Sequence, residues 1–340
     1  PFMIYPWGSN PIFTTTKPLY LQLFVLFMWL VIIVRKKYKT IELSKTYKVE
    51  IFLSVFFLII CLSTILSEYP MTAIYGTNGR SEGLFTFLAY FSIFLFSYRF
   101  LKEEQQKNII SGIVITSILV SVYGILQHFQ LDFLPRSSGR IGYDRSYAFF
   151  GNPNFYGSYL VIIIMLGATL FLTSKTKRTS TLFLVALGLA FVALLFTGTR
   201  SGWVGTFSAL LFMSFIVVLK RKYLWKKWFT LIVTLVSLTI IINAVDKVDY
   251  SARVNTFVVD TYKVVSNQST GHEGSSRLFI WEKSLPLVKE YFLLGSGPDT
   301  FKYVSPATPE EREKYLGVRN MIVDKAHNEY LHMAITMGVP

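Results

Sequence analysis

The chain has little charge and almost no cysteine. Only 16% of its 340 residues are charged, whereas 52% are hydrophobic and 16% are aromatic. A soluble globule of this size needs more polar surface, so the composition excludes that class and predicts a polytopic membrane protein. The single cysteine, Cys61, excludes an intramolecular disulfide and a cysteine-based zinc site. Because it lies inside an apolar run, we expect it to be a small packing residue.

Motifs for metal and nucleotide chemistry are also missing. The sequence contains no HExxH, no GxSxG, no P-loop and no paired aspartates of the kind that metal-dependent glycosyltransferases use. The turn GSGPDTF, from Gly295 to Phe301, resembles a phosphate loop only superficially, because it lacks a third glycine and a Gly-Lys-Ser/Thr sequence. We therefore predict that the protein uses no metal and no cofactor.

The formal net charge of +14 raises the question of nucleic acid binding. The basic residues, however, form short clusters between apolar runs rather than one continuous surface. This pattern is typical of membrane topology and of contact with anionic lipids. We therefore expect membrane lipids as partners and no nucleic acid.

Apolar runs long enough to cross a membrane follow one another along most of the chain. Because backbone polar groups cannot stay unpaired in lipid and the runs lack the alternation of barrel strands, we predict helices. The sequence thus predicts an all-α membrane bundle of about nine spans, with a ninth run beginning near Asn328. The other eight runs lie near residues 18–34, 49–66, 83–98, 109–127, 155–173, 180–197, 202–219 and 228–245.

The basic residues predict the orientation of these helices. The loops after runs one, three, five and seven hold half of the 34 lysines and arginines, so we assign them to the cytoplasm. The alternation then places residue 1 outside, and we expect the chain to be part of a longer protein of ten or more spans, truncated at both ends. The intervening loops, which we assign to the outside, hold only Arg80, then Arg136, Arg140 and Arg145, then Arg200.

Three segments follow from this topology. Residues 1–245 form a transmembrane helical bundle with short loops, and residues 246–326 form a large extracytoplasmic loop that contains amphipathic helices. Residues 327–340 begin a further transmembrane helix. The long polar loop is the interval in which we expect the unusual chemistry to lie.

Arginines on an outer loop oppose the usual excess of positive charge on the cytoplasmic side. Arg140 and Arg145 lie on such a loop, within residues 134–160, which suggests that they have an anionic partner. That partner could be a ligand. Equally, the arginines could pair with Asp132 and Asp144 or with lipid headgroups.

The long loop has an amphipathic pattern between Ser275 and Phe301. Ser275 is the expected N-cap of this helix and would place Arg277 in the first turn. The helix dipole disfavours a cation there, so the position makes sense if the helix N-terminus and the arginine together bind an anion. A salt bridge to Glu273 or Glu282 is an equally good explanation on spacing alone. The predicted apolar face, on the membrane surface or on the helix bundle, consists of Leu278, Trp281, Leu285 and Val288.

One arginine, Arg200, stands at the junction of two apolar runs in the sequence TGTRSGWVG. A lone arginine at membrane depth is costly, so we expect it to face a polar cavity, where its fork suits bidentate binding of a pyrophosphate. Alternatively, its side chain extends to the membrane–water interface and has no role beyond setting the topology of the helices.

A histidine, His327, marks the return of the chain to apolar sequence. We expect Asp324 to cap the last helix, which would place His327 in its first turn, where the helix dipole disfavours a charged imidazole. A neutral imidazole can act as a general base, although a lone histidine is as often structural. His332 would project about 140° away on this helix, so we expect the two histidines to share neither a site nor a metal.

Four segments, in the same order and with one long outer loop, resemble the O-antigen ligase and polymerase superfamily of bacterial membrane glycosyltransferases. The resemblance covers about residues 140–338, and the earlier segment FFGNPNFYGSYL is similar to the family too. The four segments are TGTRSGWVG, SSRLFIWEKSLPLV, LLGSGPDTF and DKAHNEYLHMAITMG.

This resemblance implies a donor glycan on undecaprenyl diphosphate and an inverting, metal-independent transfer at the outer face of the bacterial cytoplasmic membrane. It implies that Arg200 and Arg277 hold the diphosphate and that His327 activates the hydroxyl of the glycan or other acceptor. Arg140 and Arg145 are matched less closely, as supporting donor contacts. Stabilising the phosphate charge that grows on the leaving group would be the main task of the arginines.

The sequence does not separate a polymerase, which extends a lipid-linked glycan, from a ligase, which moves it to another acceptor. Two other classes of function stay open. A transporter or flippase of lipid-linked glycans would place charged residues in mid-membrane helices, whereas here they gather at the rim. A non-catalytic membrane scaffold would use the long outer loop to bind a partner.

Overall fold

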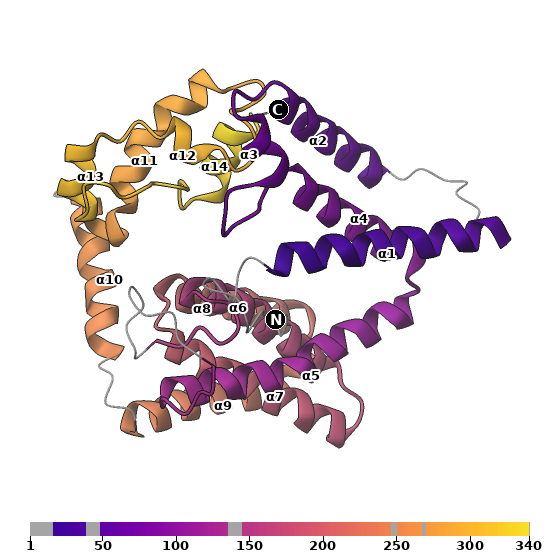
Figure 1. The fold of residues 1–340 in the computed structure, drawn as a ribbon. Helices are drawn as coiled ribbons and strands as arrows, with labels where there is room; N and C mark the ends of the chain where they lie inside the picture. Colours follow the sequence, from indigo (N-terminus) through magenta and orange to yellow (C-terminus); the bar gives the residue numbers. More distant parts are fainter. Residues whose placement is uncertain (1–15, 39–47, 135–144, 246–249, 267–269, 340) are drawn as a thin grey trace. The chain divides into compact units, whose positions relative to one another are not determined.

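The structure is a computed structural model that describes residues 16–38, 48–134, 145–245, 250–266 and 270–339. In these ranges the regular secondary structure is helical, and no strand is present (Figure 1). The chain divides into two compact units. Unit 1 contains Leu101–Asn255, and unit 2 joins Thr15–Phe100 to Thr256–Pro340.

Each of the eight predicted apolar runs forms a helix. Seven of the described helices are long and apolar enough to cross a membrane, and an eighth, α4, is shorter at 17 residues. The prediction of an all-helical polytopic membrane bundle is thereby confirmed. The eight are α1 (Thr16–Tyr38), α2 (Lys48–Ile65), α4 (Leu84–Phe100), α5 (Glu103–His128), α6 (Pro153–Thr173), α7 (Lys177–Thr197), α8 (Arg200–Lys220) and α9 (Trp225–Val245), the last preceded by the 3₁₀ turn η1 (Lys222–Leu224).

Unit 1 is built on the contact of α6 with α7, and α5, α8 and α9 pack around this pair. Small and branched side chains such as Ala186, Leu187 and Ile164 are fully buried between the helices. Tyr156 is also fully buried, and its hydroxyl donates to the carbonyl of Val120 at 3.1 Å, which ties α6 to α5. A buried hydroxyl with a partner avoids the cost of an unmade hydrogen bond.

Large apolar side chains cover the outside of several helices. Phe207 and Phe212 on α8 are 63% and 67% exposed, and Phe229 on α9 is 61% exposed. An exposed apolar surface of this extent is unusual for a soluble protein but is what lipid requires of a membrane helix. Burial and composition therefore agree on the class of protein.

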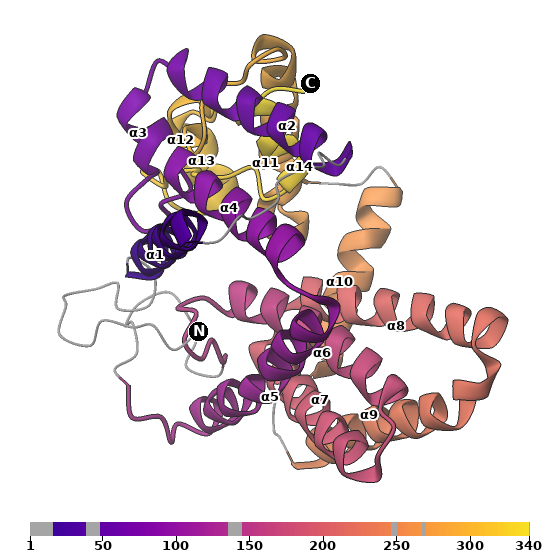
Figure 2. The same ribbon diagram turned by 90° about the vertical axis from the view of Figure 1, so that its right-hand side faces the viewer.

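Unit 2 contains α1 to α4 together with the C-terminal helices. Ser63 and Ser67, at the end of α2, donate to the carbonyls of Thr336 and Ser296 at 2.9 and 2.6 Å. Helix α12 packs against α14, and its Tyr303 hydroxyl lies 3.1 Å from the hydroxyl of Thr72 on α3 (Figures 1 and 2). The remaining helices, several of them too short for the sequence pattern to reveal, are α3 (Pro70–Tyr75), α10 (Tyr250–Val265), α11 (Glu273–Glu290), α12 (Phe301–Val304), α13 (Pro309–Leu316) and α14 (Glu329–Thr336).

The amphipathic helix of the long loop exists, but two details of its prediction are wrong. Helix α11 begins at Glu273 with His272 as the N-cap, so Ser275 is not the cap and Arg277 lies in the second turn. The residues that α11 buries are Phe279, Ile280, Ser284 and Leu287.

The face predicted to be apolar stays more open, with Trp281 37% and Leu285 66% exposed. Both faces of α11 carry apolar residues, and packing against α13 and α14 determines which of the two faces is buried.

The last helix also begins later than predicted. Its N-cap is Asn328, whose side-chain oxygen accepts from the amide of Leu331 at 3.3 Å, rather than Asp324. The eight residues of α14 end at Thr336, which is too short to cross a membrane. The division into segments 1–245, 246–326 and 327–340 by membrane side stays a prediction.

Candidate functional site

His327 directly precedes the N-cap of α14 instead of lying in the first turn. Its backbone has a positive φ of 52°, which is uncommon for a residue other than glycine. The residue is exposed to solvent. Partial desolvation and the positive charge of Arg277 together lower the pKa of His327 below its ordinary value. The imidazole is therefore neutral near pH 7 and can accept a proton, although the cause is not the helix dipole that the sequence suggested.

Arg277 reaches the neighbourhood of His327 because α11 holds the segment before the histidine. Trp281 donates from its indole nitrogen to the carbonyl of Ala326 at 2.9 Å. Residues four apart share one face of a helix, so Arg277 lies on the same side of α11 as Trp281. Among the described side chains, Arg277 forms no ion pair with Glu282, and its charge acts on His327 instead.

The charges of Arg80, Asp324 and Lys325 act on His332 as well as on His327, while the expectation that the two histidines share neither a site nor a metal stays a prediction. Burial lowers the pKa of His332 to about 3, and the charges of Lys325 and Arg80 add to this shift. The predicted angle of 140° assumed that both histidines stand on one helix, whereas His327 precedes α14. Within the described chain, His332 has no hydrogen-bond partner at Nδ1, and its ring lies 5.5 Å from that of Phe301.

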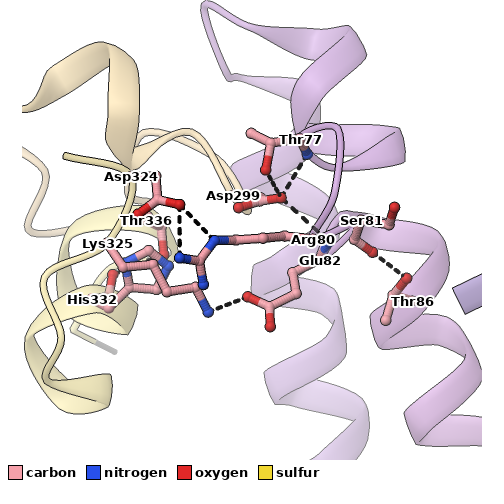
Figure 3. A network of polar contacts seen from close by, with 10 residues as sticks. All are labelled: Thr77, Arg80, Ser81, Glu82, Thr86, Asp299, Asp324, Lys325, His332 and Thr336. Carbon is pink, nitrogen blue, oxygen red and sulfur yellow. Dashed lines mark hydrogen bonds and ion pairs between the residues drawn. The ribbon is translucent and has the colours of Figure 1, made fainter. Parts of the chain in front are cut away.

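Two ion pairs bind the segment before His327 to the loop between α3 and α4 (Figure 3). Arg80 donates from Nε and its terminal nitrogen to Asp324, each at 2.7 Å, and Lys325 pairs with Glu82. Sequence reasoning missed Arg80 and Glu82 as site residues. The signal that could have found Arg80 is its place as the sole basic residue of a short loop assigned to the outside.

Unit 1 brings Arg145 and Arg200 to one junction. Arg200 is the first residue of α8, directly after the N-cap Thr199. Arg145 donates from Nε to the carbonyl of Thr197 at 2.8 Å and from a terminal nitrogen to Thr199 Oγ1 at 3.4 Å. A cation at the C-terminal end of α7 complements the helix dipole, so Arg145 has a structural role at this junction. Arg140 lies outside the described residues.

The turn from Gly295 to Phe301 uses its amides inside the protein. The amides of Ser296 and Gly297 donate to the carbonyls of Ile335 and Thr336 at 2.9 and 2.8 Å. A phosphate loop must keep such amides free for its ligand. This turn therefore connects α14 to the rest of unit 2.

Among the described residues, no group of three or more histidines, cysteines and acidic side chains is placed to hold a metal ion. The groups that are placed together are a neutral imidazole, the cation of Arg277 and two ion pairs, Arg80–Asp324 and Lys325–Glu82. Such a set can accept a proton and can stabilise a negative charge beside it.

The apolar helices and this polar cluster together define a polytopic membrane protein with a cluster of charged residues next to a histidine. Residues 183–340 match the model of the O-antigen ligase family, and this match supports the O-antigen ligase superfamily for that part of the chain. The match contains Arg200, Arg277 and His327, whereas Arg80, Arg140 and Arg145 precede it. No curated protein and no solved structure matches the chain. The family supports a function of the O-antigen ligase or polymerase type.

Proposed function

We propose that the protein is a membrane glycosyltransferase that transfers or polymerises glycan from an undecaprenyl-diphosphate-linked donor. The reaction would take place at the outer face of the bacterial cytoplasmic membrane, with inversion and without a metal. The acceptor would be the hydroxyl of a glycan or of another molecule. The observation that carries this proposal is the match of residues 183–340 to the O-antigen ligase family, a region that contains Arg200, Arg277 and His327.

His327 would act as the general base. Its imidazole takes the proton of the acceptor hydroxyl while the hydroxyl oxygen attacks the anomeric carbon from the side opposite the diphosphate. A new glycosidic C–O bond forms as the bond from the anomeric carbon to the phosphate oxygen breaks. The electron pair of that bond leaves with the lipid diphosphate, and because the attack comes from the opposite side, the configuration at the anomeric carbon inverts.

Arg277 and Arg200 would bind the diphosphate. A guanidinium binds phosphate oxygens through two parallel hydrogen bonds and keeps its charge at any physiological pH. Its stabilising effect grows as negative charge develops on the leaving group, which lowers the barrier to transfer. Arg145 and Arg140 remain supporting contacts to the donor in this proposal.

The test is transfer by the purified full-length protein from an undecaprenyl-diphosphate-linked glycan. We expect His327→Ala to lower kcat about 10²- to 10⁴-fold, the usual contribution of a general base, and Arg200→Ala to lower it about 10²-fold or more. His272→Ala, a change at an exposed histidine of the same unit, is the matched control. Transfer at the wild-type rate by His327→Ala and Arg200→Ala would refute the assignment.

The product of the same assay separates the two subclasses. A longer glycan on the lipid carrier indicates a polymerase, and free carrier with a modified foreign acceptor indicates a ligase. We expect a chelator to leave the rate unchanged, because arginines rather than a metal ion stabilise the leaving group. Complete loss of activity with the chelator would contradict the metal-independent mechanism.

A further inference from the structure

The loop between α3 and α4 is organised by one buried carboxylate. Asp299 Oδ2 accepts hydrogen bonds from the amide and the hydroxyl of Thr77, at 2.6 and 2.8 Å, and from the amide of Glu82 at 3.3 Å (Figure 3). Asp299 is only 3% exposed. A buried carboxylate that accepts several hydrogen bonds fixes the groups that donate to it, so the loop has a defined backbone at both ends.

This loop carries one positive and one negative side chain, and each faces a side chain of opposite charge in the segment before His327. Arg80 pairs with Asp324, and two residues later Glu82 pairs with Lys325. If the segment slid by one residue, Arg80 would face Lys325, and like charges repel at this distance. The pattern therefore fixes the register of residues 324 and 325 against the loop.

The segment is also held from its other side. Trp281 of α11 donates to the carbonyl of Ala326, the residue between Lys325 and His327. Three consecutive residues before His327 are thus fixed by side chains from two separate elements. A histidine with a positive φ needs such surroundings, since an unsupported chain would relax to a commoner conformation.

We propose that Arg80 and Glu82 are positioning residues that hold His327 in place through Asp324 and Lys325. Neither residue lies within the region that matches the family model. The expected effect on glycan transfer rests on the proposed function. The positioning of His327 can be measured without any substrate. Partly exposed ion pairs contribute little to global stability, so we expect local rather than global effects when they are broken.

The first measurement is hydrogen exchange in peptides that cover residues 321–331 of the full chain. We expect Arg80→Glu to accelerate exchange at residues 324–328 at least fivefold, and the double variant Arg80→Glu/Asp324→Arg to return it toward the wild-type rate. Arg319→Glu is the matched control, because Arg319 pairs with Glu310 at 2.8 Å but is 59% exposed. Equal exchange in Arg80→Glu and Arg319→Glu would overturn the proposal, whether or not the protein transfers glycan.

The second measurement is transfer kinetics. We expect Arg80→Glu to lower kcat at least tenfold with little change in KM for the lipid-linked donor, and the double variant to recover most of the loss. The exchanged pair Glu82→Lys/Lys325→Glu should behave in the same way, and Arg80→Lys should keep part of the activity. Equal thermal unfolding of all variants in detergent shows that a loss of kcat is local.

The outcomes of this experiment and of the test of the proposed function are distinct. If His327→Ala abolishes transfer while Arg80→Glu transfers at the wild-type rate, the function stands and the positioning role falls. If the wild-type protein transfers no glycan but Arg80→Glu accelerates exchange and the double variant restores it, the positioning role stands and the proposed function falls.

Discussion

At the scale of single residues, the local environment of His327 decides its chemistry. An ordinary histidine has a pKa of about 6.5 and is partly charged in neutral solution. Partial desolvation and the charge of Arg277 lower the pKa of His327, so the base is neutral where the enzyme would work. Sequence patterns indicated a neutral histidine but attributed it to a helix N-terminus that the residue does not occupy.

The pH dependence of transfer tests this environment. A base must be unprotonated, so activity is retained above the pKa of His327 in the folded protein and lost as the pH falls through it. We therefore expect the acid limb of kcat/KM below about pH 6.5 in the wild type. Arg277→Gln removes a charge that lowers this pKa, so the limb should move to higher pH.

The exposed arginine variant Arg319→Gln is the control for that measurement and should leave the limb in place. If Arg277→Gln reduces the rate but leaves the acid limb unmoved, Arg277 contributes to catalysis without affecting the base.

At the scale of elements, the turn Gly295 to Phe301 shows how closely the backbones approach in unit 2. Gly295 has a φ of 72°, and a Cβ atom there would lie 2.3 Å from the amide nitrogen of Met337. Both the backbone conformation and the space require glycine. The sequence GSG resembles a phosphate loop only superficially, and in the structure the amides of Ser296 and Gly297 donate to carbonyls of α14.

Gly295→Ala tests this packing. The strained φ and the overlap with α14 together should destabilise unit 2 by roughly 2–5 kcal/mol. Gly317 offers a matched control, because its φ is 77° but nothing lies within 4 Å of a Cβ atom placed on it. Gly317→Ala should therefore cost only about 1 kcal/mol from the backbone. Equal thermal unfolding temperatures in detergent for the two variants would contradict the close approach.

At the scale of the whole molecule, the chain leaves unit 2 after α4, forms unit 1, and returns to unit 2 in α10. The C-terminal polar segment thus packs with helices from the first hundred residues of the sequence. The division into consecutive segments by membrane side does not describe this packing. It remains a prediction about topology, and labelling can test it.

Cysteine labelling is suited to this chain because Cys61 is its single cysteine. In a Cys61→Ser background, we expect Glu310→Cys to react with a membrane-impermeant maleimide in intact cells. Lys222→Cys, in the loop between α8 and α9, should react only after the cells are opened. Both residues are exposed, so access to the reagent depends on the side of the membrane. Labelling of Lys222→Cys in intact cells would reverse the proposed orientation.

The sequence by itself determined the class of fold, because long apolar runs in lipid must pair their backbone groups within helices. It also indicated Arg200, Arg277 and His327 through residue patterns that resemble one family, and the matched region contains all three. Local pattern was enough for the helices because each depends on neighbours in the chain, whereas the roles of the three residues stay predictions.

Only the tertiary structure decided which face of α11 is buried, where α14 begins, and that His332 lies in the electrostatic environment of His327. It alone paired Arg80 with Asp324, which stand 244 residues apart. No local rule of spacing or propensity reaches across that distance. The surroundings of His327 therefore depend on tertiary packing, because the charged residues that fix its position and shift its pKa come from elements that meet only in the folded chain.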